Sequence, residues 1–485
     1  MPRRSSGGRA VSFSFDEVLA PAVRFGVNEL RRSTPSAVKR ILANSAWNDL
    51  GRHLSARLTF ALTPTLFFYQ KVAKAVAWSM PVKDRAGNRG AADRITLLEA
   101  SQEFPDLLET ASRLIFAWIE AQRELLTRLW KDRVAVSSIF LRGTGRFRVV
   151  GIRPGLSDPH DAGRSVTLIQ FAGARRVIYK PRPCDGEQLW FEALAWLNRN
   201  GIRAPFRIPI LLPRKNYTWM EFLRPKTCRN RSMVRLFYFR WGVQVALAQL
   251  LEATDLHREN WLAVGSQPIL VDAELIGDER HSSSLRRKKA LDRQSPAVLL
   301  RTGLLPLTRR DRAGSYHGIA PFDATIAENG PIGCWPRCSG AIQKPAAYVN
   351  DLSRGFTAVV EIFGIAGSAR EFYREIILRS GGERENRRVL LRASAQYARF
   401  LRASLEPRNM ISTGERWRRL VRACCASSID RRTGVAEARA LLRCDIPKFT
   451  ARRSFRPLSW NRFSGAIANL KNSLRLLRSR AQTQN

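Results

Sequence analysis

Two aspartates and an asparagine stand at a spacing that suits the transfer of a phosphoryl group. Asp255 comes first, Asn260 lies five positions on, and Asp272 follows the apolar run Ile269-Leu270-Val271. Phosphoryl transfer needs a carboxylate that faces the attacking hydroxyl and oxygen ligands that fix a magnesium ion. The spacing therefore predicts a phosphoryl-transfer loop, although an ordinary surface loop could carry the same three residues.

A strand-borne lysine precedes this stretch. The runs Phe147–Ile152, Val166–Phe171 and Val177–Lys180 predict strands, and Ala172-Gly173-Ala174 predicts the turn between the second and third. Lys180 then lies near the end of a hairpin strand, where kinases hold ATP phosphates. Alone, such a lysine is more often a solvated edge residue.

The order of the following elements favours the catalytic interpretation. Helices are expected over Asp185–Asn200 and Met233–Ala253, with strands over Ile208–Leu212 and Tyr217–Phe222 between them. The second helix leads directly to Asp255. A β-rich region with a lysine, then a helix, then the Asp…Asn…Asp set is the order found in protein kinases.

The N-terminal part is expected to be helical. Apolar residues recur at three- and four-residue spacing from Val38 to Leu58, and again from Phe104 to Val134. Pro64 interrupts the first pattern, and residues 83–90 read as a polar link. Packing of a hydrophobic core explains both helical blocks.

The composition indicates a folded and strongly basic protein. Hydrophobic residues make up 45%, and 82 basic against 41 acidic residues give a net charge of +41. Such a surface attracts nucleic acid, anionic lipid or an acidic peptide. The basic residues are spread along the chain, however, with only short clusters such as Arg286–Lys289. We therefore interpret them as a compositional habit rather than a binding stripe.

Cysteine usage and hydropathy suggest a reduced, cytoplasmic protein. Seven cysteines form no regular framework, and no signal peptide precedes them. Cys334 and Cys338 lack the further cysteine pair or histidines of a zinc site. The apolar run from Leu58 to Tyr69 is too short to span a bilayer, so no membrane span is expected.

Several motifs occur in an order that resembles the dehydratase domain of class II lanthipeptide synthetases, over roughly residues 100–450. They include Tyr179-Lys180-Pro181-Arg182, Thr254–Asn260, Val271-Asp272-Ala273-Glu274, Thr302–Pro306, Arg388–Tyr397 and Asp445–Phe449. The resemblance implies an α+β fold, with a lipid-kinase-like two-lobed catalytic core and extensive added helices. It also implies phosphorylation of Ser and Thr in a precursor peptide by ATP, followed by elimination to dehydroalanine or dehydrobutyrine.

On this basis the chain is expected to comprise four regions. They are a helical region (1–95), a helical segment with a β-rich lobe (96–250), a second lobe with the catalytic segments (251–450), and a basic helical tail (451–485). The zinc-dependent cyclase domain that usually follows is expected to be absent. Cyclisation would then need a separate cyclase or spontaneous thiol addition.

The resemblance assigns roles in phosphorylation to six residues. Lys180 would hold the phosphates of ATP, and Asp255 and His257 would form the transfer loop. The expected ligands of Mg²⁺ are Asn260, Asp272 and, directly or through another ligand, Glu274.

Elimination requires a base for the α-proton and a cation for the departing phosphate. The family has an Arg and, six residues later, a Thr; here these positions hold Arg388 and Ser394. Serine keeps the hydroxyl but loses the β-branch that restricts its rotamer. Asp158 and His160 match a further family motif and are assigned to phosphate handling or elimination.

Two alternatives remain open at this point. One is a peptide kinase that no longer eliminates phosphate, because Ser394 replaces the threonine. The other is a basic protein that binds a leader peptide or nucleic acid and has lost catalysis. The dehydratase hypothesis implies a precursor peptide, made of a leader and a Ser/Thr-rich core, as the partner. Nucleic acid is not an expected partner.

Overall fold

The computed structural model divides the chain into two compact units. Unit 1 comprises residues 1–181 and 392–448, and unit 2 comprises 182–391 and 449–485. The structure describes residues 15–79, 95–143, 147–254, 256–274, 276, 302, 304, 333–379, 386–389, 391–392, 394–426, 428, 430–452, 461, 463–464 and 467. The expected polar link at 83–90 and the cluster at 286–289 lie outside these residues.

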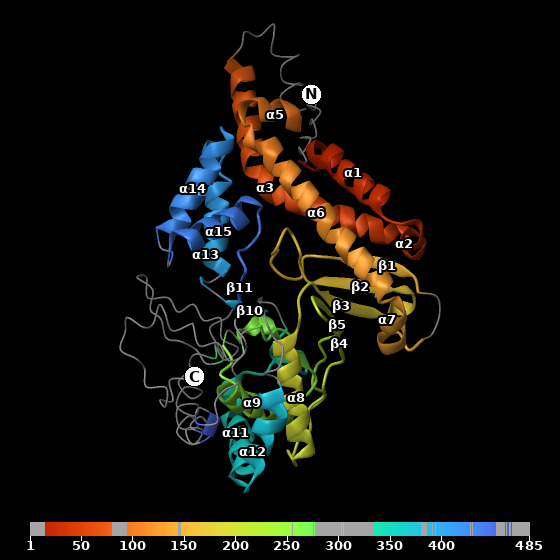
Figure 1. The fold of residues 1–485 in the computed structure, drawn as a ribbon, viewed down its shortest axis with the longest axis vertical. Helices are drawn as coiled ribbons and strands as arrows, with labels where there is room; N and C mark the ends of the chain where they lie inside the picture. Colours follow the sequence, from red (N-terminus) through yellow and green to blue (C-terminus); the bar gives the residue numbers. More distant parts are fainter. Residues whose placement is uncertain are drawn as a thin grey trace, which may run out of the picture. The chain divides into compact units, whose positions relative to one another are not determined.

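Unit 1 begins with helices that pack along one another. Figure 1 shows α1, α3 and α6 side by side, and the apolar face of α6 is buried through Leu114, Trp118 and Leu125. This face recurs every three or four residues, as expected for an amphipathic helix. The helices of this part are α1 (Phe15–Ser33), α2 (Ser36–Ile41), α3 (Asn44–Ser79), α5 (Leu97–Glu103), α6 (Asp106–Lys131) and α7 (Arg133–Phe140).

The expectation that Pro64 interrupts the first helical pattern is wrong. Helix α3 continues through Pro64 without a break. Proline in a helix interior costs about 3 kcal/mol because it removes one hydrogen bond and crowds the preceding turn. Leu62, Thr65 and Leu66 around it are fully buried, and their burial offsets that cost.

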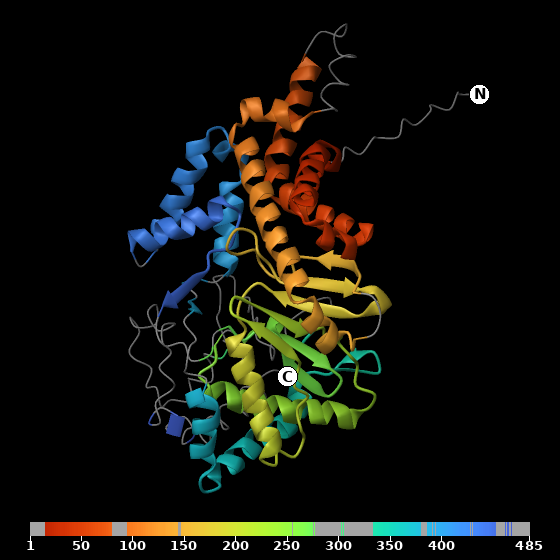
Figure 2. The same cartoon turned by 45° about the vertical axis from the view of Figure 1, so that its right-hand side comes forward.

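An antiparallel set of three strands follows in unit 1. The strands β1 (Val149–Arg153), β2 (Thr167–Phe171) and β3 (Arg176–Lys180) are joined by pairs such as Ile152↔Ile169 and Ile169↔Val177. The turn between β2 and β3 uses Gly173 and Ala174 in the left-handed region, as the Ala-Gly-Ala motif suggested. Helix α3 packs against β1 (Figure 2).

The last part of unit 1 is tied together by a buried arginine. Helices α13 (Ser394–Ser404), α14 (Thr413–Cys425) and α15 (Arg431–Leu442) pack on one another. Arg416 of α14 is fully buried and donates to Thr110 Oγ1 at 2.8 Å and to Leu441 O at 3.3 Å. Its Nη1 lies 3.7 Å from the buried carboxylate of Asp106, so one guanidinium links α6, α14 and α15.

Unit 2 is built around two closely packed helices, α9 (Arg231–Leu250) and α11 (Val349–Gly364), which lie side by side in Figure 1. A Cβ on Gly242 would overlap the carbonyl oxygen of Leu352, and one on Gly355 would overlap that of Phe239. Reciprocal glycines therefore let the two backbones touch. Helices α8 (Asp185–Arg199) and α12 (Ser368–Phe372) and the π-helical turn η6 (Tyr373–Leu378) complete this part.

The strands of unit 2 form short antiparallel pairs. They are β4 (Leu211–Arg214) with β5 (Tyr217–Glu221), β6 (Trp261–Val264) with β7 (Gln267–Leu270), β8 (Arg337–Cys338) with β9 (Ala341–Ile342), and β10 (Asn386–Val389) with β11 (Phe449–Arg452). The mixture of helices and antiparallel strands agrees with the expected α+β class. The four regions expected from the sequence are divisions by role and stay predictions.

Within the described part of the chain, no helix combines the length and the apolarity required to cross a bilayer. The run from Leu58 to Tyr69 belongs to α3, and its residues Leu58 and Leu62 are buried in unit 1.

Replacing Arg416 with alanine is expected to destabilise unit 1 by about 3–5 kcal/mol, because it removes the positive charge that faces the buried carboxylate of Asp106 and leaves that carboxylate only its hydrogen bond from Thr110. Burial already raises the pKa of Asp106 to about 6, against the opposing charge of Arg416. A raised carboxyl pKa means that stability falls as pH rises through the ordinary value towards 6. Without the charge of Arg416 the pKa of Asp106 will lie higher still, so the fall will continue to higher pH and the loss will be larger at pH 8 than at pH 5.

Chemical denaturation at the two pH values measures this effect. Arg418→Ala is the matched control, because Arg418 lies on the same helix in an exposed pair with Glu415 and should cost at most about 1 kcal/mol. Equal losses in the two variants would contradict the role of Arg416.

Candidate functional site

The hairpin of β6 and β7 brings two of the expected metal ligands to the same end of a ladder. Asn260 immediately precedes β6, and Asp272 follows β7 by two residues. The register Trp261↔Leu270 continues one step further, because the amide of Val271 donates to the carbonyl of Asn260 at 2.7 Å. Asn260 therefore lies opposite Val271 in the ladder, and Asp272 is the next residue after Val271.

The loop before this hairpin is anchored by buried groups. Leu256 is buried and its amide donates to the carbonyl of Thr302 at 2.8 Å. The indole of Trp261 donates to Leu256 O at 3.2 Å and stacks on Trp241 of α9. His257 follows Leu256 at the start of the 3-10 turn η3 (Arg258–Asn260) and is partly exposed. Asp255 lies outside the described residues.

Arg182 gathers three carboxylates around the segment that carries Asp272 and Glu274. Its guanidinium grips Glu187 of α8 with two hydrogen bonds, of 2.6 and 3.1 Å. It also donates to Asp272 Oδ1 at 2.8 Å and forms an ion pair with Glu274 through Nε. Burial alone would lower the pKa of Arg182, but the three carboxylates outweigh it and hold that pKa well above its usual value. Glu274 thus joins this cluster.

The charge of this cluster suits a divalent cation. One guanidinium faces three carboxylates, Glu187, Asp272 and Glu274, which leaves a surplus of two negative charges among them. Glu187 is fully buried, whereas the side chain of Asp272 is 34% exposed. Among the described residues no group of three or more His, Cys, Asp or Glu is arranged to hold a metal ion. Mg²⁺ commonly uses only one or two carboxylates with water and phosphate oxygens, so Asn260 and Asp272 fit it.

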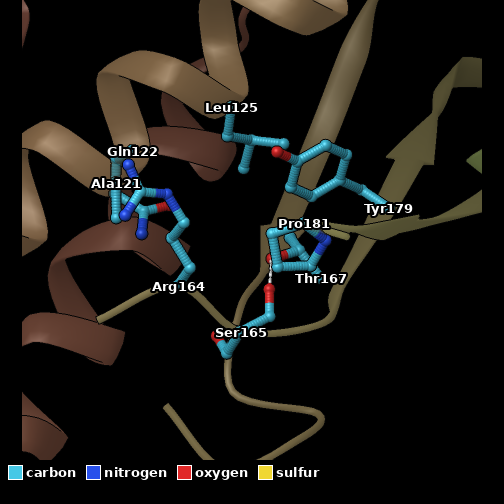
Figure 3. Close-up of a pocket in the computed structure, with 8 residues that line it drawn as sticks. All are labelled: Ala121, Gln122, Leu125, Arg164, Ser165, Thr167, Tyr179 and Pro181. Carbon is cyan, nitrogen blue, oxygen red and sulfur yellow. Dashed lines mark hydrogen bonds between the residues drawn. The ribbon is translucent and has the colours of Figure 1, made fainter. Parts of the chain in front are cut away.

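Lys180 ends strand β3 in unit 1 and is only 4% exposed. Its neighbours Tyr179 and Pro181 line a small hollow together with residues of α6 (Figure 3). The phenol of Tyr179 accepts a hydrogen bond of 2.6 Å from Arg128, and burial raises its pKa to about 12. Tyr179 therefore remains protonated, and Lys180 is held in a rigid strand beside this hollow.

The segment that carries Asp158 and His160 is an unusual turn held by Asp445. Asp161, Ala162 and Gly163 all have positive φ, a conformation that costs non-glycine residues about 1–3 kcal/mol. The buried carboxylate of Asp445 accepts the amide protons of Ala162 and Gly163 at 2.8 and 2.9 Å. These two bonds compensate the strain and fix the turn.

The same contact orients His160. Its Nδ1 lies 2.7 Å from the carbonyl oxygen of Ile446, and the amide of Ile446 donates to Pro159 O at 2.8 Å. Because a carbonyl oxygen can only accept, Nδ1 must carry a proton, and Nε2 is the acceptor nitrogen of the neutral ring. Asp158, two residues earlier, is exposed. His160 is thus oriented as a proton acceptor.

Ser394 is the first residue of α13 in unit 1, and the chain that leads into it is fixed by Arg392. Arg392 is buried, makes hydrogen bonds of 2.8 and 3.0 Å to Glu437, and donates to Cys424 O at 2.8 Å. The hydroxyl of Tyr397 donates to the same Glu437 at 2.6 Å. Arg388 lies on β10 of unit 2, paired with Thr450.

The expected site residues thus fall into two sets. Unit 2 holds Asn260, Asp272 and Glu274 close together, with His257 before them and Arg388 on a separate strand. Unit 1 holds Lys180, the loop with Asp158 and His160, and Ser394. The assigned catalytic roles stay predictions.

Comparison with known proteins identifies the family. Residues 104–325 and 324–452 match the model of a family described as a domain of unknown function (DUF4135). The chain belongs to this DUF4135 family. It is also 24% identical over 148 residues to the lacticin 481/lactococcin biosynthesis protein LcnDR2 of Lactococcus lactis subsp. lactis. The resemblance to the dehydratase domain of class II lanthipeptide synthetases is confirmed.

The match to this lactococcal protein is partial. It covers 27% of the present chain and 16% of the relative, so the chain spans a small share of that protein's length. The match therefore does not by itself transfer the activity of the whole lactococcal protein to this chain.

Sequence reasoning did not assign roles to Arg182, Glu187 and Asp445 in this DUF4135 domain. Arg182 and Asp445 lie inside motifs on which the family resemblance rests. Their place in these motifs is the one feature of the sequence that could have pointed to them. Their partners are distant in sequence: Asp445 holds a turn at Ala162, and Arg182 reaches Asp272.

Replacing Asp445 with alanine is expected to release the turn that orients His160, because two backbone amides and Arg57 lose their acceptor. Hydrogen exchange measured by mass spectrometry should then be faster in peptides covering residues 158–164. Asp430→Ala is the matched control, since Asp430 caps α15 at an exposed position in the same unit. Unchanged exchange at 158–164 in the Asp445 variant would refute this role.

Proposed function

We propose that this DUF4135 protein is a peptide dehydratase that uses ATP and Mg²⁺ to phosphorylate Ser and Thr of a precursor peptide and then eliminates phosphate. The observation that carries the proposal is that Asn260 and Asp272 lie at the same end of the β6–β7 hairpin, where Asn260 pairs with Val271, the neighbour of Asp272. The family match supplies the peptide-modifying context. A lipid-kinase-like arrangement of the catalytic core is part of the same proposal.

In the phosphorylation step the protein binds and orients the reactants. Asp255 accepts the proton of the substrate hydroxyl, and His257 supports the transfer loop. Lys180 would neutralise phosphate oxygens of ATP, and Asn260 and Asp272 would hold the metal, with Glu274 as a further ligand or a group that supports the ligands. When bound, Mg²⁺ neutralises charge on the transferred phosphoryl group.

In the elimination step a base removes the α-proton of the phosphorylated residue. The electron pair of the C–H bond forms the C=C bond, and the C–O bond to phosphate breaks. His160 has the orientation of such a base, because its Nδ1–H is held by Ile446 O. Arg388 receives the departing phosphate with parallel hydrogen bonds, and the hydroxyl of Ser394 donates a further hydrogen bond to it. Asp158 assists at the same loop.

The positive charge of the protein suits an acidic leader segment in the precursor. A net charge of +41 accelerates the capture of an oppositely charged peptide, particularly at low salt.

Co-expression with the precursor peptide encoded nearest to this gene tests the proposal. Mass spectrometry should show the loss of one water per modified Ser or Thr. Asp272→Asn should reduce both phosphorylation and dehydration at least about a hundredfold, because it removes the negative charge of a metal ligand. A cognate peptide that gains no phosphate and loses no water would rule out the proposed activity.

The same assay distinguishes the two alternatives. Persistent phosphopeptide made by the unaltered protein would favour a kinase that fails at elimination, as Ser394 could cause. Binding to arbitrary DNA with a steep salt dependence, without ATP hydrolysis, would favour a basic binding protein.

Replacing Arg388 with alanine is expected to uncouple the two steps, because phosphate would lose its supporting cation at departure. Phosphopeptide should accumulate while the rate of phosphorylation stays within a fewfold of that of the unaltered protein. Arg387→Ala is the matched control on the same strand and should still yield dehydrated peptide. Full dehydration by the Arg388 variant would show that the elimination role is assigned to the wrong residue.

A further inference from the structure

We infer that Arg182, Gly186 and Glu187 form a positioning clamp that holds the segment Asp272-Ala273-Glu274 for divalent-metal binding. This inference rests on the proposed function and adds three residues to which the resemblance gives no role. All six residues belong to unit 2 and therefore to one compact body.

The first part of the clamp is electrostatic. Arg182 is 9% exposed, and its guanidinium contacts Glu187, Asp272 and Glu274 at the same time. Glu187 is fully buried on the first turn of α8, so it gives the guanidinium a fixed partner on a rigid helix. With its position set by Glu187, Arg182 fixes the side chains at both ends of the 272–274 segment.

The second part is steric and independent of charge. Gly186 is the second residue of α8, and a Cβ built on it would overlap the carbonyl oxygen of Ala273. The first turn of α8 therefore touches the backbone of the metal-ligand segment directly. Because Ala273 is itself buried, the segment has no room to move away without disturbing its neighbours.

Arginine is needed for this arrangement rather than any cation. Its planar group offers five N–H donors in a fixed fork, whereas lysine presents a compact ammonium on a flexible stem. Lysine at 182 would preserve the charge of the cluster but could not grip Glu187 with two parallel bonds and reach Asp272 and Glu274 as well. The substitution Arg182→Lys thus keeps the positive charge at position 182 and removes the hydrogen-bonding geometry of the guanidinium.

The clamp also explains how the surplus negative charge is directed. Glu187 is closed to solvent, and Glu274 is only 12% exposed, whereas Asp272 is 34% exposed. A cation arriving from solvent therefore meets Asp272 first, next to Asn260 on the paired backbone. Arg182 offsets part of the charge of all three carboxylates, and Asp272 is the most exposed of them.

Binding of Mn²⁺ together with a non-hydrolysable ATP analogue, followed by calorimetry on the full chain, tests the clamp without relying on turnover. Arg182→Lys and Gly186→Ala should each weaken Mn²⁺ binding by about 10- to 100-fold, the usual effect of losing a group that orients a metal ligand. Gly186→Ala leaves all four charges in place, so it carries the test if the lysine variant does not fold.

Two substitutions serve as matched controls. Gly364→Ala changes a helical glycine of the same unit whose Cβ would meet nothing within 4 Å, and Arg199→Lys changes an exposed arginine paired with Glu375. Both should bind Mn²⁺ as the unaltered protein does. Equal or tighter Mn²⁺ binding by folded Arg182→Lys or Gly186→Ala overturns the clamp, whereas absence of Mn²⁺-nucleotide binding in the unaltered protein overturns the proposed function itself.

Discussion

A guanidinium that leaves water must find acceptors for its five N–H groups, and this constraint organises much of the described structure. Arg416 satisfies it with groups from α6 and α15, and Arg392 with Glu437 and the carbonyl of Cys424. Arg182 satisfies it with three carboxylates. In each case segments far apart in sequence are fixed in one geometry, because an incomplete set of partners would be costly.

This constraint changes the meaning of the basic composition. The even spread of arginines along the chain favours a compositional habit as their explanation. For exposed residues such as Arg418, the structure shows no further role. Arg182, Arg392 and Arg416 are different, because each is buried and multiply bonded. Their bonds are directional, so lysine could not replace them. Part of the arginine content therefore supports tertiary structure rather than a binding surface.

Local patterns in the sequence predicted the elements well and the contacts poorly. The period-two runs located β2, β3 and β5, and the helical period located α6 and α8, because burial of one face sets both patterns. The short strand β6 was not predicted, since Trp261–Val264 is too short to show a period. The continuation of α3 through Pro64 and the partners of Arg182 and Asp445 were also not foreseeable. Each depends on residues brought together only by folding.

The two expected chemical steps place different demands on the backbone. Metal-assisted phosphoryl transfer needs ligands fixed at bonding distance, and paired β6 and β7 give Asn260 and Asp272 this regularity. Elimination needs a base whose accepting nitrogen points towards the substrate, and His160 sits on an irregular turn instead. Such a turn would be mobile if its amides were solvated, but Asp445 binds two of them while Ile446 holds the imidazole. The segment around Asp445 therefore makes the irregular turn at residues 160–163 rigid, as the β-ladder does for the β6–β7 hairpin. The orientation of His160 thus depends on the carboxylate of Asp445, to which no catalytic role is assigned.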